Sequence, residues 1–360
     1  MNATRELHEL GQRLWLDNIT REMLDDGTLR RYVDELSVTG LTSNPTIFDE
    51  AIGGSGAYDA AIREGAAAGL SGEALFLSLA LDDLRRAADL FRPIFDATGG
   101  VDGWVSMEVS PLLASDAQGT IDAARRIHAQ AARPNLFVKI PGTPEGIDAI
   151  EESIYAGVPV NVTLLFSREQ YLAAAEAYLR GIERRIEAGR DPHVASVASL
   201  FVSRWDRAVA ARVPEALRNR LGIAVGARTY RAYRELLASP RWSRLAAAGA
   251  LPQRLLWAST GTKDPAAPDT LYVEALAAPD TIDTMPEKTL RAVADHGRLR
   301  GVLAADGGDA EDVLAEFARA GVDVDALAAD LQREGAASFV KSWHQLLQRI
   351  AEKSAALERA

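Results

Sequence analysis

Lysine is rare in this chain of 360 residues, and one lysine lies inside an apolar run. Only five of the 40 basic residues are lysines, namely Lys139, Lys263, Lys288, Lys341 and Lys353. Lys139 stands within the run Leu136–Gly142. Burial disfavours an ammonium ion, so this lysine is a candidate for a neutral amine that attacks a carbonyl and forms a Schiff base. Lys341 falls in a helical pattern, and we expect it to be a surface charge, as we do Lys288 and Lys353.

Polar residues alternate with aliphatic ones in the runs near Lys139. Glu108 lies on the polar face of Trp104–Ser110, and Asn161 and Thr163 oppose the aliphatic residues of Val160–Leu164. Successive strand residues point to opposite faces, so each run has one aliphatic and one polar side. Isolated polar residues often only cap helices, which is our interpretation for Thr143 and Ser167. A Glu and a Lys flanked by aliphatic residues are seldom buried without a partner or a function.

Short β-like runs alternate with longer amphipathic stretches along the chain. The expected strands are Leu14–Ile19, Glu35–Ser43, Trp104–Ser110, Leu136–Gly142, Val158–Phe166, Val194–Phe201, Arg254–Ser259 and Thr281–Met285. The expected helices include Ser71–Phe91, one that starts at Thr143-Pro144-Glu145, and Tyr171–Ile186 behind a capping box at Ser167–Gln170. Such alternation predicts βαβ units and a parallel sheet.

Eight such units predict an α/β fold, a (β/α)8 TIM-type barrel, as one domain over residues 1–360. Inserted helices are expected in Asp49–Gly100, between strands 2 and 3, and a helical tail is expected from Asp309 to Ala360. An open doubly wound sheet is the alternative, but its G-x-G-x-x-G signal after the first strand is missing.

A barrel gathers polar residues from the C-terminal ends of its strands into one catalytic mouth. The residues that take such positions are Asp17, Asn44, Glu108, Lys139, Asn161, Thr163 and Ser199. Schiff-base chemistry needs proton shuttles, which carboxylates near the amine can provide. Glu108 and Asp17 come from different strands and are expected to face the same interior. Neutral side chains such as Asn44 and Thr163 can bind substrate hydroxyls without adding charge.

Composition excludes several other classes of function. The chain has no cysteine, and its five histidines are dispersed, so we expect no metal site. A net charge of −11 argues against a nucleic-acid partner but leaves small anions such as sugar phosphates possible. No apolar run approaches the roughly 20 residues of a membrane span. The N-terminus carries no apolar signal region, so we expect a cytoplasmic protein.

In the motifs that contain these residues, the chain resembles the transaldolase family. Thr39–Phe48 is similar to the family's first signature, and Asn135–Ile147 is similar to the second, which surrounds the Schiff-base lysine. Further matches are Leu16–Asn18, Val105–Val109, Asn161–Phe166, Ala198–Arg204 and Asp283–Pro286. The resemblance runs from near Leu10 to the C-terminus. It implies a barrel enzyme that moves a dihydroxyacetone unit between sugar phosphates in the non-oxidative pentose phosphate pathway, without metal or organic cofactor.

The resemblance also implies roles for single residues. Lys139 resembles the Schiff-base lysine, Asp17 the acid/base at the C4 hydroxyl, and Glu108 the residue that works through a water in making and breaking the imine. The other matched positions belong to substrate binding: Asn44 and Asn161 for the three-carbon unit, Thr163 for the water, Ser199 and Arg204 for phosphate, and Phe201 for the pocket wall.

The phosphate site departs from the better-known members, which carry Ser-x-Arg after strand seven. Here the segment is Ala258–Lys263, and it resembles a branch shared with plant and actinobacterial members. Ser259 would keep its role, and Lys263 would supply the cation. Arg204 opens a helix, where an arginine is also often only a surface charge.

Two alternatives to transfer are a related Schiff-base aldolase, a lyase that releases dihydroxyacetone, and a catalytically silent barrel that binds sugar phosphate. The chains of the related fructose 6-phosphate aldolases are much shorter, which disfavours the first alternative. Loss of Lys139, Glu108 or Asp17 would mark the second, and all three are present. The family includes dimers, so we expect a homodimer.

Overall fold

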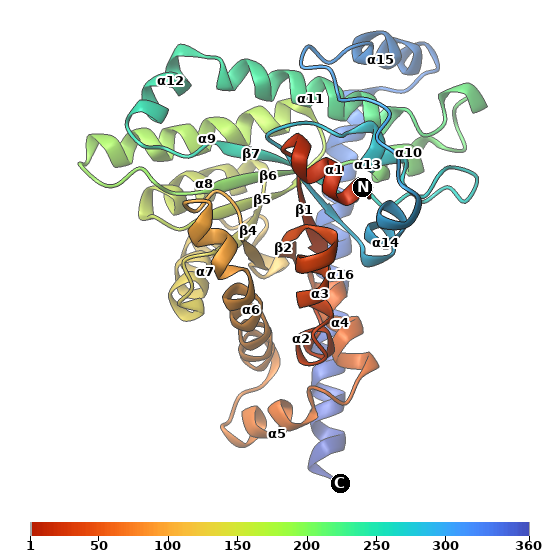
Figure 1. Cartoon of the computed structure of the whole chain (residues 1–360). Coiled ribbons are helices and arrows are strands. Elements are labelled where there is room, and N and C mark those ends of the chain that lie inside the picture. Colours follow the sequence, from red (N-terminus) through yellow and green to blue (C-terminus); the bar gives the residue numbers. More distant parts are fainter. Residues whose placement is uncertain (1, 360) are drawn as a thin grey trace.

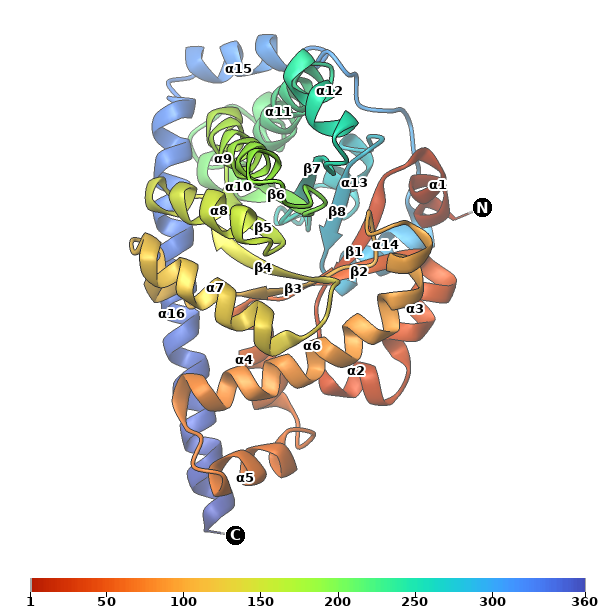
Figure 2. The same cartoon turned by 90° about the vertical axis from the view of Figure 1, so that its left-hand side faces the viewer.

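Eight parallel strands form a nearly closed barrel in the computed structural model, which describes residues 2–359 (Figure 1). Neighbouring strands follow the order β2-β1-β8-β7-β6-β5-β4-β3, and helices surround the ring (Figure 2). The strands are β1 (Arg13–Asp17), β2 (Val38–Thr42), β3 (Val105–Glu108), β4 (Leu136–Pro141), β5 (Val160–Leu165), β6 (Ser196–Phe201), β7 (Gln253–Ala258) and β8 (Ile282–Met285). The predicted (β/α)8 barrel is confirmed, and the open doubly wound sheet is wrong.

Sixteen α-helices connect and cover these strands within the described residues. They are α1 (Ala3–Leu10), α2 (Arg21–Asp25), α3 (Thr28–Leu36), α4 (Pro45–Gly54), α5 (Asp59–Ala67), α6 (Gly72–Ala97), α7 (Ala117–Ala131), α8 (Pro144–Ala156), α9 (Arg168–Glu187), α10 (Ser203–Val209), α11 (Leu221–Leu237), α12 (Pro240–Ala247), α13 (Leu271–Ala275), α14 (Glu287–His296), α15 (Ala310–Arg319) and α16 (Val324–Glu358). Among these, no helix is long and apolar enough to cross a membrane.

The local signals for helices are confirmed, several strand boundaries differ from the prediction by one or two residues, and the largest error is at the start of β2. Thr143 accepts a hydrogen bond from the backbone N–H of Gly146 at the start of α8, and Ser167 forms a capping box with Gln170 at the start of α9. The second strand was expected from Glu35, but α3 extends to Leu36. Ser37 then ends this helix in a left-handed conformation with φ 57°. The strand therefore begins at Val38, the next residue.

Side chains of the strands divide between two apolar layers, as the alternation predicts. Outward residues such as Leu14, Val105, Leu136, Val138 and Val160 pack against the surrounding helices. Inward residues form a second cluster that includes the aromatic rings of Trp15, Trp104 and Phe137.

The aromatic cluster fills the end of the barrel where the strands begin. The rings of Trp104 and Phe137 are stacked with their centroids 4.0 Å apart. The indole nitrogen of Trp15 donates a 3.0 Å hydrogen bond to buried Asp102, whose other oxygen lies 3.5 Å from Nε of Arg13. Buried Arg254 also lies at this end and donates to the carbonyl of Thr281 at 2.9 Å, whereas the predicted site residues lie at the opposite mouth.

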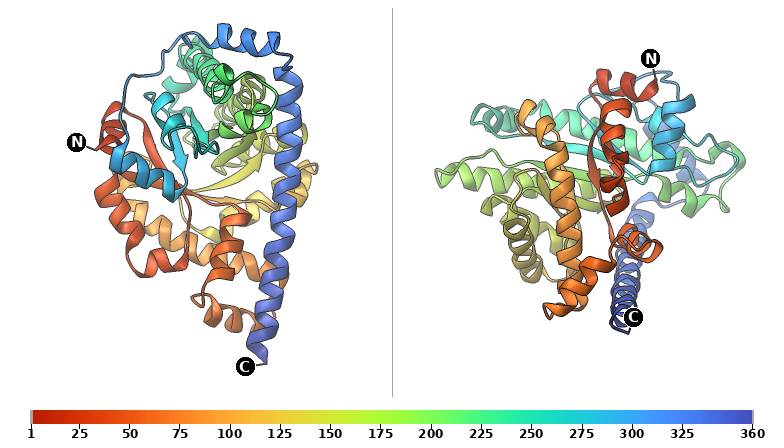
Figure 3. Two further views of the ribbon diagram at one scale, coloured as in Figure 1. Left: turned by 90° about the vertical axis from the view of Figure 1, so that its right-hand side faces the viewer. Right: turned by 60° about the horizontal axis from the view of Figure 1, so that its bottom comes forward.

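The inserted helices α4, α5 and α6 and the tail helices α15 and α16 lie where the sequence predicts them. Helix α16 runs along one flank of the barrel and reaches beyond it to α4 and α5 (Figure 3). Lys341 is exposed on α16, as expected. Lys353 is not a plain surface charge, because its amine donates to the carbonyl of Ile52 at 2.9 Å and lies 2.9 Å from Oδ1 of Asp59. It therefore fastens the tail to the insertion.

The barrel closes where β2 and β3 approach each other. The backbone N–H of Leu41 donates a 2.9 Å hydrogen bond to the carbonyl of Trp104. A Cβ atom at Gly40 would lie 2.6 Å from that carbonyl oxygen and 2.7 Å from the indole nitrogen of Trp15. Only glycine allows the two strands to meet this closely.

We expect Gly40→Ala to lower the free energy of unfolding by about 1–3 kcal/mol, because backbone and indole must move apart to admit the methyl group. Gly54→Ala is the matched control, since nothing lies within 4 Å of a Cβ atom there. Urea denaturation of both variants and the wild type measures the difference. Equal stability of the two variants would contradict this account of closure.

Candidate active site

The mouth of the barrel holds a cavity of about 120 Å³ that brings most of the predicted residues together. Those that line it are Asp17, Asn44, Lys139, Thr163, Ser199, Phe201, Arg204, Ser259 and Lys263. Glu108 and Asn161 do not line it, but each contacts a residue that does. The structure therefore assembles all of the predicted site residues at one place.

Lys139 extends from β4 into the interior and is only 5% exposed. Its amine donates a 3.0 Å hydrogen bond to the carbonyl of Ser43, which follows β2. The same amine lies 3.8 Å from Oε2 of Glu108. Strand pairing explains this contact, because Glu108 of β3 and Lys139 of β4 are register partners. The amine thus has one carbonyl and one carboxylate beside it, and the cavity that Lys139 lines leaves space for a substrate next to it.

Glu108 is buried, and its Oε2 atom accepts no hydrogen bond from the described residues. Burial raises the pKa of Glu108 to about 7; the charge of Lys139 opposes this rise, and the charge of Asp17 adds to it. A carboxyl with this pKa populates both protonation states near neutral pH. It can therefore give and take protons next to the amine.

Asp17 ends β1 and faces the cavity. Burial raises its pKa, while the charge of Lys139 and a hydrogen bond from Thr42 lower it. The Thr42 hydroxyl donates to Oδ1 of Asp17 at 2.7 Å and lies 2.6 Å from the hydroxyl of Thr284 on β8. Three neighbouring strands thus fix the orientation of this carboxylate.

Neutral polar groups surround the amine on the side of β5 and β6. Asn161, the register partner of Lys139, donates to the Ser106 hydroxyl at 3.1 Å and accepts from the Ser199 hydroxyl at 2.7 Å. The hydroxyl of Thr163 is buried without a hydrogen bond to the described residues. Such an unpaired hydroxyl at the cavity wall can bind a water or a substrate oxygen.

Asn44 connects the cavity to the inserted helices. Its side-chain oxygen caps α4 by accepting a 3.1 Å hydrogen bond from the backbone N–H of Ile47. The side-chain nitrogen of Asn44 donates no hydrogen bond to the other described residues, so it can donate one to a ligand in the cavity.

Cationic residues occupy the outer part of the cavity. The Arg204 guanidinium lies 5.0 Å from the ring of Phe201 and 5.9 Å from that of Phe339. Within the described residues no carboxylate lies within 4.0 Å of it, and the charges of Glu108 and Glu334 act on it only from further away. Exposed Lys263 lines the same cavity. Ser259 has φ 57°, and its hydroxyl lies 3.0 Å from that of Ser203.

The cavity has five further lining residues: Thr42, Ala258, Thr284, Pro286 and Phe339. Thr42 and Thr284 lie in stretches that resemble the family, and their inward parity is the signal that could have identified them. Phe339 belongs to the tail helix α16, and nothing in its local sequence distinguishes it from an ordinary core residue.

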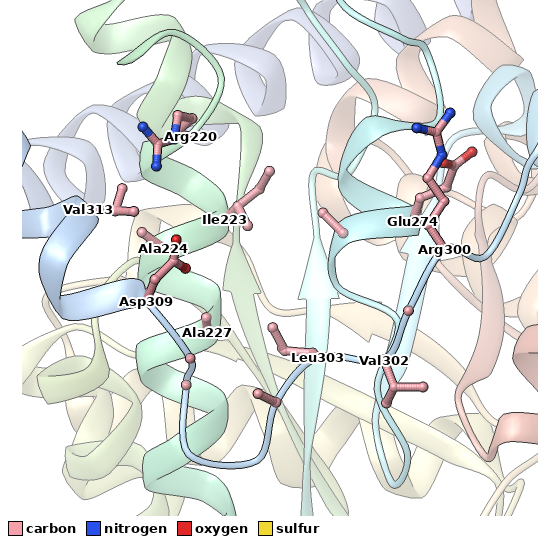
Figure 4. A pocket seen from close by; sticks show the side chains of 15 residues that line it. Arg220, Ile223, Ala224, Ala227, Glu274, Arg300, Val302, Leu303, Asp309 and Val313 are labelled. Atoms are coloured by element: carbon pink, nitrogen blue, oxygen red, sulfur yellow. The ribbon is translucent and has the colours of Figure 1, made fainter. Parts of the chain in front are cut away.

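A larger hollow of about 510 Å³ lies elsewhere, between α11, α13 and the segment before α15 (Figure 4). Arg220, Glu274, Arg300 and Asp309 are at its edges, and none of the predicted site residues lines it. The buried amine and the carboxyl groups with raised pKa values lie at the mouth instead. The mouth is therefore the candidate active site.

Comparisons with known proteins identify the family of this chain. The family model described as Transaldolase/Fructose-6-phosphate aldolase matches residues 14–350. The chain is 46% identical over 362 residues to a protein of Frankia alni named transaldolase, covering 98% of this chain and 97% of that one. Proteins of the same name from Thermobifida fusca and Neisseria gonorrhoeae are 45% identical over 361 residues and 42% identical over 348 residues, covering 98% and 96% of this chain and 98% and 99% of theirs. The chain belongs to the transaldolase/fructose-6-phosphate aldolase family.

Asp283 fixes the segment that follows β7 and carries the cationic end of the site. The hydroxyl of Thr260 donates to Oδ1 of Asp283 at 2.8 Å, while Oδ2 has no partner among the described residues. Asp283 is completely buried, and burial raises its pKa to about 7 against the lowering effect of the Thr260 bond. The carboxyl is therefore protonated in the folded chain below neutral pH.

This burial predicts how stability depends on pH. Between about pH 4 and pH 7 the folded chain keeps a proton on Asp283 that the unfolded chain has lost, so raising the pH lowers the free energy of unfolding. Asp283→Asn removes this contribution and keeps an oxygen for Thr260. We expect the stability of the variant relative to wild type to rise by at least about 1 kcal/mol from pH 5 to pH 8 in urea denaturation.

The contribution of Glu108 is common to both proteins and cancels in this comparison. A stability difference that stays constant with pH would contradict the assignment to Asp283.

Proposed function

We propose that this protein transfers a dihydroxyacetone unit from sedoheptulose 7-phosphate to glyceraldehyde 3-phosphate, giving erythrose 4-phosphate and fructose 6-phosphate. The observation that carries the proposal is the buried Lys139 amine, 3.8 Å from a carboxyl whose pKa is about 7, at a cavity that Asp17 also lines. Relatives named transaldolase, whose alignments cover nearly the whole chain, support the same activity.

Lys139 begins the reaction as a nucleophile. Its neutral amine adds to the C2 carbonyl of the ketose, and the carbonyl oxygen takes a proton to become the hydroxyl of a carbinolamine. Loss of that hydroxyl as water leaves the protonated imine. Glu108 supplies and recovers these protons through a water, for which its two populated protonation states suit it. The unpaired Thr163 hydroxyl can hold this water.

Asp17 acts at the next step, the cleavage of the carbon–carbon bond. Its carboxylate removes the proton of the C4 hydroxyl, the C3–C4 bond breaks, and its electron pair moves into the imine to form an enamine. The aldose leaves, and the enamine carbon then attacks the acceptor aldehyde, whose oxygen takes the proton back from Asp17. The hydrogen bond from Thr42 keeps the carboxylate oriented for both directions.

The remaining residues bind the substrate. Asn44 and Asn161 orient the three-carbon unit, and Phe201 forms the wall beside it. The phosphate lies toward the cations Arg204 and Lys263 and the hydroxyls of Ser199 and Ser259. A chain with a net charge of −11 needs such a local cluster to attract an anionic sugar phosphate. From the family resemblance we also propose that the protein is a cytoplasmic homodimer. Light scattering, which measures the mass of the particle in solution, tests the dimer.

Borohydride reduction in the presence of fructose 6-phosphate tests the proposal. We expect a three-carbon adduct on Lys139 in peptide mapping, because the imine at this amine is the reactive intermediate. An adduct on any other lysine would overturn the assignment. Fructose 6-phosphate without an acceptor aldehyde should give no sustained turnover. Sustained turnover would favour the lyase, and absence of both adduct and transfer would favour a silent sugar-phosphate-binding barrel.

The two carboxyl groups should be separable by mutation. We expect Asp17→Asn to form the imine while it slows bond cleavage, and Glu108→Gln to slow imine formation and hydrolysis. Positioned acids and bases typically contribute about 10²- to 10⁴-fold, so losses of that size are expected in the affected step. Rapid-quench borohydride trapping measures the first step, and release of aldose measures the second. Wild-type rates in both steps for both variants would show that the roles are misassigned.

A further inference from the structure

Helix α16 is fastened to the mouth of the barrel through Gln332. The side-chain nitrogen of this buried residue donates to the carbonyl of Gly142, which follows β4, at 2.9 Å and to that of Leu164 in β5 at 3.0 Å. Leu164 has a left-handed backbone with φ 59°, where the pairing of β5 with β6 is irregular. The irregular strand end and the tail helix therefore fit each other.

Gly335, one turn further along α16, brings the helix next to Arg204. A Cβ atom at this position would lie 2.9 Å from Cδ2 of Leu164 and 3.1 Å from Nη1 of Arg204. Glycine thus lets the helix backbone approach the guanidinium closely. Gln332, Gly335 and Phe339 are spaced three and four residues apart, so they share one face of the helix.

Phe339 completes this face and lines the same cavity as Lys139. Its ring lies 5.9 Å from the Arg204 guanidinium, which also lies 5.0 Å from the ring of Phe201. Phe201 is in turn held by Phe166, at a centroid distance of 5.3 Å. Two aromatic rings from distant parts of the chain therefore lie beside one half-buried cation.

Contacts with α4 fix α16 along its length. The Thr46 hydroxyl donates to that of Ser342 at 2.9 Å, and Arg349 pairs with Asp49. Helix α4 begins directly after Asn44, which lines the cavity. The tail thus packs against a second element of the site, so Phe339 is held in place.

We propose that Phe339 is a positioning residue for phosphate binding, and that the face of α16 formed by Gln332, Gly335 and Phe339 is part of the substrate site. The proposal rests on the proposed function, because it takes the anion beside Arg204 to be the phosphate of the sugar. An aromatic ring attracts and orients a guanidinium without neutralising it. A carboxylate in its place would compete with the phosphate for the N–H donors.

Replacing the ring while keeping the hydrophobic contact tests the proposal. We expect Phe339→Leu to weaken competitive inhibition by inorganic phosphate about tenfold and to raise KM for fructose 6-phosphate by a similar factor, with kcat changed less than twofold. Borohydride trapping of unphosphorylated dihydroxyacetone on Lys139 should keep its wild-type rate. Phe339→Tyr retains the ring and should restore phosphate inhibition to within about twofold of wild type. Arg204→Ala gives the reference for complete loss of the guanidinium.

Phe76→Leu is the matched control, because Phe76 packs edge-on against Trp343 of α16, with centroids 5.2 Å apart, and does not line the cavity. It should leave phosphate inhibition unchanged. Equal weakening in both leucine variants, or none in Phe339→Leu, would overturn the proposal. If Phe339→Leu does not fold, Phe339→Met takes its place and the same outcomes decide. Wild-type protein that binds phosphate but forms no adduct with dihydroxyacetone would refute the proposed function instead.

Discussion

The burial of one lysine amine is the constraint on which the arrangement of the mouth depends. A charged amine removed from water is costly unless partners lie beside it, and here these are one carbonyl at 3.0 Å and one carboxyl at 3.8 Å. The carboxyl has no hydrogen-bond donor for Oε2 among the described residues. Burial raises the pKa of this carboxyl, Glu108, to about 7. A carboxyl fully paired with cations and hydrogen-bond donors would stay ionised at neutral pH and would not exchange protons there.

The parity of the strands explains how much of this site could be predicted from the sequence. Alternation assigns each strand residue to the interior or to the helices without tertiary information, so Glu108 and Lys139 could be placed on the inner side. The predicted start of β2 was wrong because the pattern at Glu35 and Leu36 fits the end of an amphipathic helix equally well, and in the structure α3 includes both residues. Phe339 could not be predicted, because its contact with Arg204 joins segments far apart in the sequence and leaves no local pattern.

The guanidinium of Arg204, at the cationic end of the cavity, has different neighbours from the Lys139 amine. Burial lowers the pKa of Arg204; the charges of Glu108 and Glu334 oppose this, but among the described residues no carboxylate lies within 4.0 Å of the guanidinium. Its close neighbours are aromatic rings, which stabilise a cation through their faces and leave its charge uncancelled. In a chain of net charge −11, this pairing with rings keeps one positive group at the mouth for an anion.

The two ends of the chain have unequal parts in the site. The groups proposed to react, Asp17, Glu108 and Lys139, all lie on strands of the barrel, whose pairings fix their distances. Phe339 comes from α16, which the structure joins to the barrel through Gln332 and to the insertion through Arg349 and Lys353. On the proposed function, a disturbance of the tail helix therefore changes how the phosphate is held before it changes the distance between the amine and its carboxyl partner. In the proposed mechanism this separation leaves the chemistry to the barrel and the binding of the substrate's charged end to the helices added to it.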